Sequence, residues 1–130
     1  MSFLRLAASA LPSAAAFATV AMLGSTSAIA QAAPTGATVY QQRCSLCHSV
    51  VPDKNGVAPS LAGVVGRKAG SLAKFSYSPA LKATGLVWTP AQLDTYLTNP
   101  QKAVPGSRMP LALGDPALRK AVIAYLATLK

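Results

Sequence analysis

The sequence predicts an all-α domain. Several short stretches begin with helix-capping residues followed by proline, and the last one repeats its apolar residues with helical periodicity. No stretch alternates apolar and polar residues as a half-buried strand does, and we find no internal repeats. Proline and glycine are frequent between the predicted helices, so we expect short helices joined by long irregular segments.

The first two predicted helices lie in the first two thirds of the chain. One runs from about Ala37 into the stretch that begins at Cys44. The next segment, residues 49–70, is rich in proline and glycine and is expected to be irregular. The second helix has Ser78-Pro79 as its cap and first position, continues to about Ala83 and is ended by Gly85.

A third helix begins at Thr89-Pro90, where Gln92 has the spacing of a capping-box partner, and stops at Asn99-Pro100. Residues 100–114 contain three prolines and two glycines, so we expect an extended stretch without helix, and Met109 lies in it.

Asp115-Pro116 caps the last predicted helix. Its apolar residues recur with the spacing of one packed helix face. They are Leu118, Val122, Tyr125, Leu126 and Leu129.

Cys44, Cys47 and His48 form the C-x-x-C-H pattern of covalent haem attachment. On one helical turn the two thiols share a face and can each form a thioether with a haem vinyl group. The histidine that follows can then give an imidazole nitrogen to the iron. The chain contains no other cysteine or histidine, which favours a single shared role for the three residues.

Three other interpretations of the motif fit less well. A thioredoxin-like dithiol needs a strand before it, whereas a helix is expected here. A structural zinc site needs a fourth protein ligand, and none is evident. A disulfide between cysteines three positions apart is strained and stabilises little. We therefore interpret the motif as a haem site.

Residues 1–30 have the layout of a bacterial secretory signal peptide. Arg5 precedes an interrupted apolar stretch, and Ala28-Ile29-Ala30 forms an A-x-A cleavage site. Cleavage after Ala30 leaves residues 31–130 as one small domain in the periplasm, where no stable membrane insertion is expected. The alternative is an uncleaved anchor, for which the apolar stretch is short and broken.

The chain is strongly basic, with 12 lysine and arginine residues against three aspartates. Without Arg5 the basic count falls to 11, and the net charge falls from +9 to +8. Such a balance suits nucleic acid, an anionic membrane surface or an acidic protein partner. Export and the lack of a long basic run argue against nucleic acid, so we favour an acidic partner. The alternative is that the charge only keeps the protein in solution.

Met109 is the one methionine outside the predicted signal peptide. A lone methionine is often core filling. Its place between Pro105 and Pro110, without a helix around it, favours axial thioether ligation of the haem iron opposite His48.

Together these features resemble the small class I cytochromes c, the bacterial and mitochondrial monohaem electron carriers. The resemblance extends from Gly36 to the last helix and implies three to four short helices wrapped around one covalently bound haem c. It implies that the N- and C-terminal helices cross, with Gly36 and Tyr40 against Val122 and Tyr125. The matching stretches are residues 44–48, 63–70, 75–77, 85–88, 96–97, 99–100 and 105–109.

The resemblance also implies roles around the haem. Pro59 is expected to give its carbonyl to the second imidazole nitrogen of His48, which fixes the ring. Tyr96 and Ser107 are expected near the Met109 sulfur, where hydrogen bonding tunes the ligand. Three further side chains are expected to bind the propionates, which are costly to bury unpaired. They are Arg67, Tyr77 and Trp88.

The sequence departs from the family pattern at three positions. Leu81 replaces a polar residue near the propionates, and Leu111 replaces an aromatic residue at the haem edge. Gln101 replaces a lysine of the ring of cations that docks partners. The remaining members of that ring are expected to be Arg43, Lys102 and Arg108.

The function implied is one-electron transfer between redox proteins of a respiratory chain, without enzymatic activity. The partners expected are an oxidase, a reductase or a dehydrogenase with an acidic docking surface. Two alternatives remain open: a permanent cytochrome subunit of a periplasmic dehydrogenase, and a haem enzyme or gas sensor in which Met109 dissociates easily.

Overall fold

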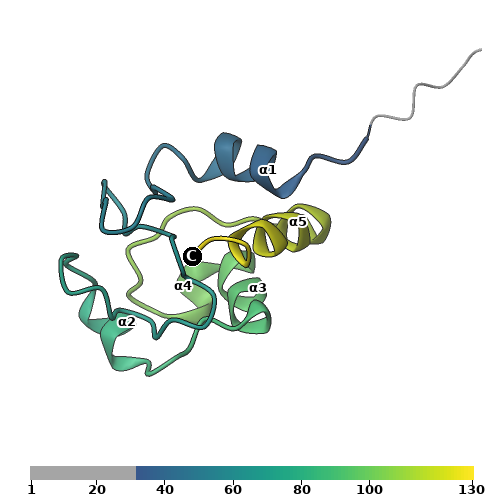
Figure 1. Ribbon diagram of the computed structural model, residues 1–130. Helices are drawn as coiled ribbons and strands as arrows, with labels where there is room; N and C mark the ends of the chain where they lie inside the picture. The colour runs from purple at the N-terminus through teal and green to yellow at the C-terminus, as the bar shows by residue number, and fades with distance from the viewer. Residues whose placement is uncertain (1–31) are drawn as a thin grey trace, which may run out of the picture. The chain divides into compact units, whose positions relative to one another are not determined.

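The computed structural model describes residues 32–130, which are helical and contain no strand (Figure 1). The predicted signal peptide, residues 1–30, lies outside the described residues. An isolated antiparallel bridge joins Lys68 to Val87. No helix of the described part is long and apolar enough to cross a membrane. The helices are α1 (Gly36–Arg43), α2 (Pro79–Ala83), α3 (Pro90–Thr98), α4 (Pro100–Ala103) and α5 (Pro116–Leu126).

Each helix begins behind a side chain that accepts a hydrogen bond from the first turn. This satisfies backbone N–H groups that have no partner within the helix. Proline occupies the first position of every helix except α1. At this position the N–H has no partner within the helix, so its absence from proline costs nothing. The capping residues are Thr35, Ser78, Thr89, Asn99 and Asp115.

The expectation that residues 100–114 are free of helix was wrong at their start. Pro100–Ala103 forms α4, because the Asn99 side chain accepts a hydrogen bond from the Lys102 N–H at 3.0 Å and Pro100 fits the first helical position. Asn99 therefore ends α3 and caps α4. The remaining residues, 104–114, are irregular as predicted.

The capping box predicted at α3 is only half formed. The Gln92 N–H donates to Thr89 Oγ1 at 3.2 Å, as expected. In a full capping box the Gln92 side chain would accept a hydrogen bond from the Thr89 N–H. Here the Thr89 N–H donates to the Val87 carbonyl at 2.7 Å instead.

The first and last helices pack directly on each other (Figure 1). Gly36 faces the α5 backbone so closely that a Cβ there would lie 2.1 Å from the Ala121 carbonyl oxygen and 2.6 Å from Tyr125 Cβ. One turn later the rings of Tyr40 and Tyr125 have centroids 5.7 Å apart. The predicted crossing is confirmed, and a glycine permits the close approach.

The other side of α5 packs against α3, which in turn contacts α4. Val39 of α1, Leu97 of α3 and Val122 of α5 are buried in one hydrophobic core. The α5 stripe was predicted in part: Val122 and Leu126 are buried, whereas Leu129 lies beyond the end of the helix and is half-buried. The two irregular segments, residues 44–78 and 104–114, extend from this helical unit.

Replacing Gly36 with alanine should lower the free energy of unfolding by about 1–3 kcal/mol, because the added methyl group has no room against α5. Denaturant unfolding measures the loss. Gly114→Ala is the matched control, since nothing lies within 4 Å of a Cβ there. Equal stability of the two variants would contradict the close approach.

Candidate haem site

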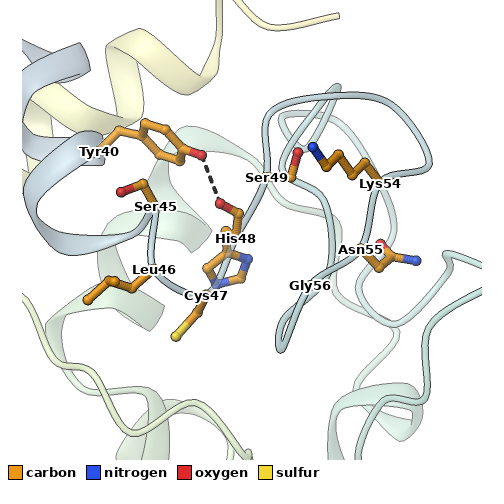
Figure 2. A pocket seen from close by; sticks show the side chains of 9 residues that line it. All are labelled: Tyr40, Ser45, Leu46, Cys47, His48, Ser49, Lys54, Asn55 and Gly56. Carbon is orange, nitrogen blue, oxygen red and sulfur yellow. Dashed lines mark hydrogen bonds between the residues drawn. The ribbon is translucent and has the colours of Figure 1, made fainter.

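The cysteine motif continues the backbone of α1 by one turn. The Cys44 N–H donates to the Tyr40 carbonyl at 2.8 Å, and the His48 N–H donates to the Cys44 carbonyl at 2.9 Å. Helix α1 itself ends at Arg43, so the motif lies on a turn rather than on the helix. Figure 2 shows the Tyr40 hydroxyl donating to the His48 carbonyl, at 2.8 Å, which ties the end of the motif back to α1.

The imidazole of His48 is held in one orientation by a backbone carbonyl. His48 Nδ1 lies 2.7 Å from the Pro59 carbonyl oxygen, as expected from the family resemblance. Because a carbonyl only accepts, Nδ1 carries the proton and Nε2 keeps its lone pair. Burial lowers the pKa of His48, although the bond to Pro59 opposes this, and the nearby Arg67 charge lowers it further. The neutral ring is the form that binds a metal.

A cleft of about 290 Å³ lies beside the motif (Figure 2). Its walls come from the end of α1, the motif itself and the loop at residues 54–56. Cys47 is exposed and Cys44 is half-buried; burial, followed by the nearby Cys47, raises the pKa of the Cys44 thiol. The lining residues are Tyr40, Ser45, Leu46, Cys47, His48, Ser49, Lys54, Asn55 and Gly56.

Arg67, Tyr77 and Trp88, the residues expected at the propionates, occupy neighbouring positions. The Arg67 guanidinium donates to the carbonyls of Ser60 and Ala62 at 2.8 and 2.9 Å. Burial raises the pKa of the Tyr77 hydroxyl, and the positive charge of Arg67 works against that rise. The main-chain N–H of Trp88 donates to the Arg67 carbonyl at 2.9 Å. Arg67 and Trp88, which are 21 positions apart, are thus joined through their main chains.

The residues expected around Met109 also lie together. The hydroxyls of Tyr96 and Ser107 are 2.5 Å apart, and both residues are buried. Ser107 Oγ accepts a hydrogen bond from the Met109 N–H at 3.4 Å. Burial raises the pKa of Tyr96, and the bond to Ser107 partly offsets this rise, so the phenol stays neutral. Met109 itself is half-buried and packs against the core.

These groups form one continuous series of contacts from His48 to Met109. Pro59 leads by the chain to Ser60, whose carbonyl binds Arg67. The rings of Trp88 and Tyr96 then connect the two halves, with centroids 4.9 Å apart. Residues 61 positions apart in the sequence are therefore linked. In order, the linked residues are His48, Pro59, Ser60, Arg67, Trp88, Tyr96, Ser107 and Met109.

The donor set fits a c-type haem. Two thiols lie within one turn of a neutral imidazole, and a half-buried thioether stands at the other end of the contact series. A structural zinc site is not supported, because residues 32–130 contain no group of three or more histidine, cysteine, aspartate or glutamate side chains arranged to hold a metal ion.

A family model described as "Cytochrome C oxidase, cbb3-type, subunit III" matches residues 31–126. The sequence is also 48% identical over 99 residues to cytochrome c2 iso-2 of Magnetospirillum molischianum, covering 75% of this chain and 98% of the relative. The chain belongs to the cytochrome c family. The resemblance seen in the sequence is thereby confirmed.

Further relatives of this cytochrome c agree. Cytochrome c2 of Rhodomicrobium vannielii is 48% identical over 111 residues, covering 83% of this chain and 88% of the relative. The solved structure of cytochrome cH from Methylobacterium extorquens matches with a TM-score of 0.67 at 42% identity, covering 72% of this chain and 94% of that one. The family carries covalent haem c, and Cys44 and Cys47 stand in its attachment motif.

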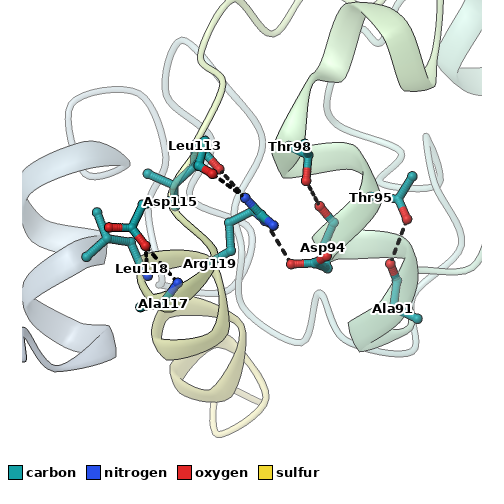
Figure 3. Close-up of polar contacts among 10 residues, drawn as sticks. Ala91, Asp94, Thr95, Thr98, Leu113, Asp115, Ala117, Leu118 and Arg119 are labelled. Atoms are coloured by element: carbon teal, nitrogen blue, oxygen red, sulfur yellow. Dashed lines mark hydrogen bonds and ion pairs between the residues drawn. The ribbon is translucent and has the colours of Figure 1, made fainter.

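Sequence reasoning missed Arg119, which anchors the C-terminal end of the segment that contains Met109. Its Nε donates to Asp94 Oδ1 at 2.8 Å, and its Nη1 donates to the carbonyls of Leu113 and Gly114 at 2.9 Å (Figure 3). Arg119 is 7% exposed although it lies on α5, where the apolar stripe alone was considered. A cation one turn after the Asp115 cap was the available signal, but its partner Asp94 is 25 positions away.

The contacts of Gln101 were also missed, because the sequence indicated only that Gln101 replaces a lysine of the docking ring. Its Nε2 donates to the carbonyls of Ser107 and Met109, at 2.5 and 3.2 Å. The side chain therefore contacts the loop that presents Met109. The other two departures, Leu81 and Leu111, are half-buried, and Leu81 packs against the core.

Arg119→Met should lower the free energy of unfolding by about 2–4 kcal/mol, because it leaves two carbonyls and Asp94 without their shared donor. Asp94→Asn should cost less than about 1 kcal/mol, since the Asp94 side chain is 49% exposed and water replaces the pair. Thermal and denaturant unfolding measure both. Similar losses in the two variants would show that the ion pair, rather than the carbonyl bonds, matters.

Proposed function

We propose that this cytochrome c is a periplasmic one-electron carrier in which His48 and Met109 are the axial ligands of the haem bound through Cys44 and Cys47. The single observation that supports this most is the series of contacts joining His48 to Met109. It links the imidazole of His48 to the main-chain N–H of Met109, and every linking residue except Ser60 belongs to the proposed haem environment.

The bound haem supplies the one-electron exchange between ferric and ferrous iron. The chain supplies the rest. The Pro59 carbonyl keeps the His48 ring oriented and raises the basicity of its free nitrogen. Tyr96 and Ser107 hold the Met109 backbone, and a thioether ligand together with an apolar environment raises the reduction potential.

Arg67, Tyr77 and Trp88 are proposed to bind the propionates. Two of the Arg67 nitrogens are occupied by carbonyls, which hold the guanidinium in place and leave its positive charge to attract a carboxylate. The indole N–H and the phenol are neutral donors. This arrangement compensates two negative charges that would otherwise be costly beside the core.

Because side chains would occupy both axial positions, no substrate could reach the iron, and the proposed carrier is not an enzyme. Cytochromes of the c2 type are generally non-enzymatic carriers that act between redox proteins. The partners proposed here have acidic docking surfaces. Three exposed cations near the motif and the Met109 loop support this, and they are Arg43, Lys102 and Arg108. The signal peptide predicted in residues 1–30 supports the periplasmic location.

Optical spectra of the holoprotein test the ligation. We expect a covalent c-type spectrum whose oxidised form has the weak methionine-to-iron charge-transfer band, and we expect Met109→Ala to lose that band while the haem stays attached. Carbon monoxide should bind the reduced variant and not the reduced wild type. A wild type that lacks the band and binds carbon monoxide readily would favour the gas sensor or enzyme, and a protein without covalent haem would refute the haem site.

Raising the ionic strength should slow electron transfer to an acidic partner, about tenfold between 0.01 and 1 M, because salt screens the steering charges. Stopped-flow reduction measures this rate. Lys102→Gln and Arg108→Gln should flatten the salt dependence, whereas Lys120→Gln on α5 should change it less. A rate independent of salt would remove the steering role, and a tight salt-resistant complex would favour the dehydrogenase subunit.

A further inference from the structure

We infer that Gln101 is a positioning residue that keeps the Met109 loop closed over the haem and so limits displacement of the thioether by other ligands. The inference rests on the proposed ligation by His48 and Met109. Gln101 is the position at which this sequence has glutamine in place of a lysine of the docking ring, and the inference gives that glutamine a role.

One amide nitrogen spans the loop. Gln101 Nε2 is the donor to both the Ser107 and the Met109 carbonyls, and a primary amide has two N–H bonds to give. The Ser107 carbonyl belongs to the peptide unit that leads into Arg108, and the Met109 carbonyl belongs to the peptide unit that follows Met109, so the side chain spans both residues. Movement of Met109 away from the core must therefore break a hydrogen bond to its own carbonyl.

The loop is held from its other side as well. The Ser107 side chain is buried and contacts Tyr96, while its main chain contacts Gln101. The preceding Gly106 has a φ of 88°, a conformation that other residues rarely adopt, so the turn before Met109 depends on glycine. Two different side chains thus fix one short, irregular segment, one through a hydroxyl and one through carbonyls.

The backbone that carries Gln101 is itself held in place. Gln101 follows Pro100, which is buried at the start of α4, and the Asn99 side chain caps that helix. Gln101 is exposed, so changing its side chain leaves no cavity. Glutamine, glutamate and leucine have similar helix propensities, so the substitutions leave α4 intact.

The experiment compares holoproteins in the ferric state titrated with imidazole, a small ligand that competes with methionine for the iron. Gln101→Leu and the isosteric Gln101→Glu remove both donors. We expect them to bind imidazole about tenfold more tightly than wild type, because loss of two hydrogen bonds favours the open loop by about that factor. The methionine-to-iron band should disappear in step with binding. Gln101→Asn, one methylene shorter, should fall between.

Two control variants separate this effect from general loosening. Gln92→Leu makes the same change at an exposed site on α3 and should match wild type within twofold. Gly36→Ala destabilises the distant α1–α5 contact and should leave imidazole affinity unchanged. If the Gln101 variants bind imidazole as wild type does, or if Gly36→Ala tightens binding equally, the inference is wrong. A wild type without the methionine band would refute the ligation itself, and the inference with it.

Discussion

The structure depends on satisfying the backbone of long irregular segments. All of the proposed haem-site residues except Tyr96 lie outside the helices, so few of their backbone groups are bonded by a helix. Side chains do this instead. Arg67 bonds two carbonyls of its own loop, Arg119 bonds two at the end of the Met109 segment, and Gln101 bonds two within it. Within residues 32–130, no buried side-chain nitrogen or oxygen lacks a partner.

This constraint explains why so little helical structure is sufficient. Each irregular segment joins the helical unit at one end, because the motif follows α1 and the Met109 segment leads into α5. Each segment then needs only local bonds to keep its course. For an electron carrier this has a direct benefit, because the two residues proposed as ligands, held in fixed loops, would move little when the charge of the iron changes.

Local features could be predicted from the residues themselves, whereas the non-local contacts that were predicted, the crossing of α1 and α5 and the Pro59 carbonyl on His48, came from the family resemblance. The starts of α2, α3 and α5 depend on a capping residue and the proline after it, which are adjacent in the chain. The motif is equally local. Helix α4 was missed because Asn99-Pro100 signals both a stop and a start, and the contacts decide which. The hydrogen bonds of Arg119 and Gln101 to backbone carbonyls were missed, because a carbonyl has no sequence signature and its position depends on the fold.

The charged residues divide by role in a way that composition alone cannot show. Asp94 pairs with Arg119 and Asp115 caps α5, so two of the three aspartates have internal partners. Arg67 and Arg119 direct their guanidinium groups to backbone carbonyls. The lysines and the remaining arginines of residues 32–130 are exposed. The excess positive charge therefore lies on the outer surface, where it would steer the acidic partner proposed above, while Arg67 and Arg119 hold the backbone of the irregular segments.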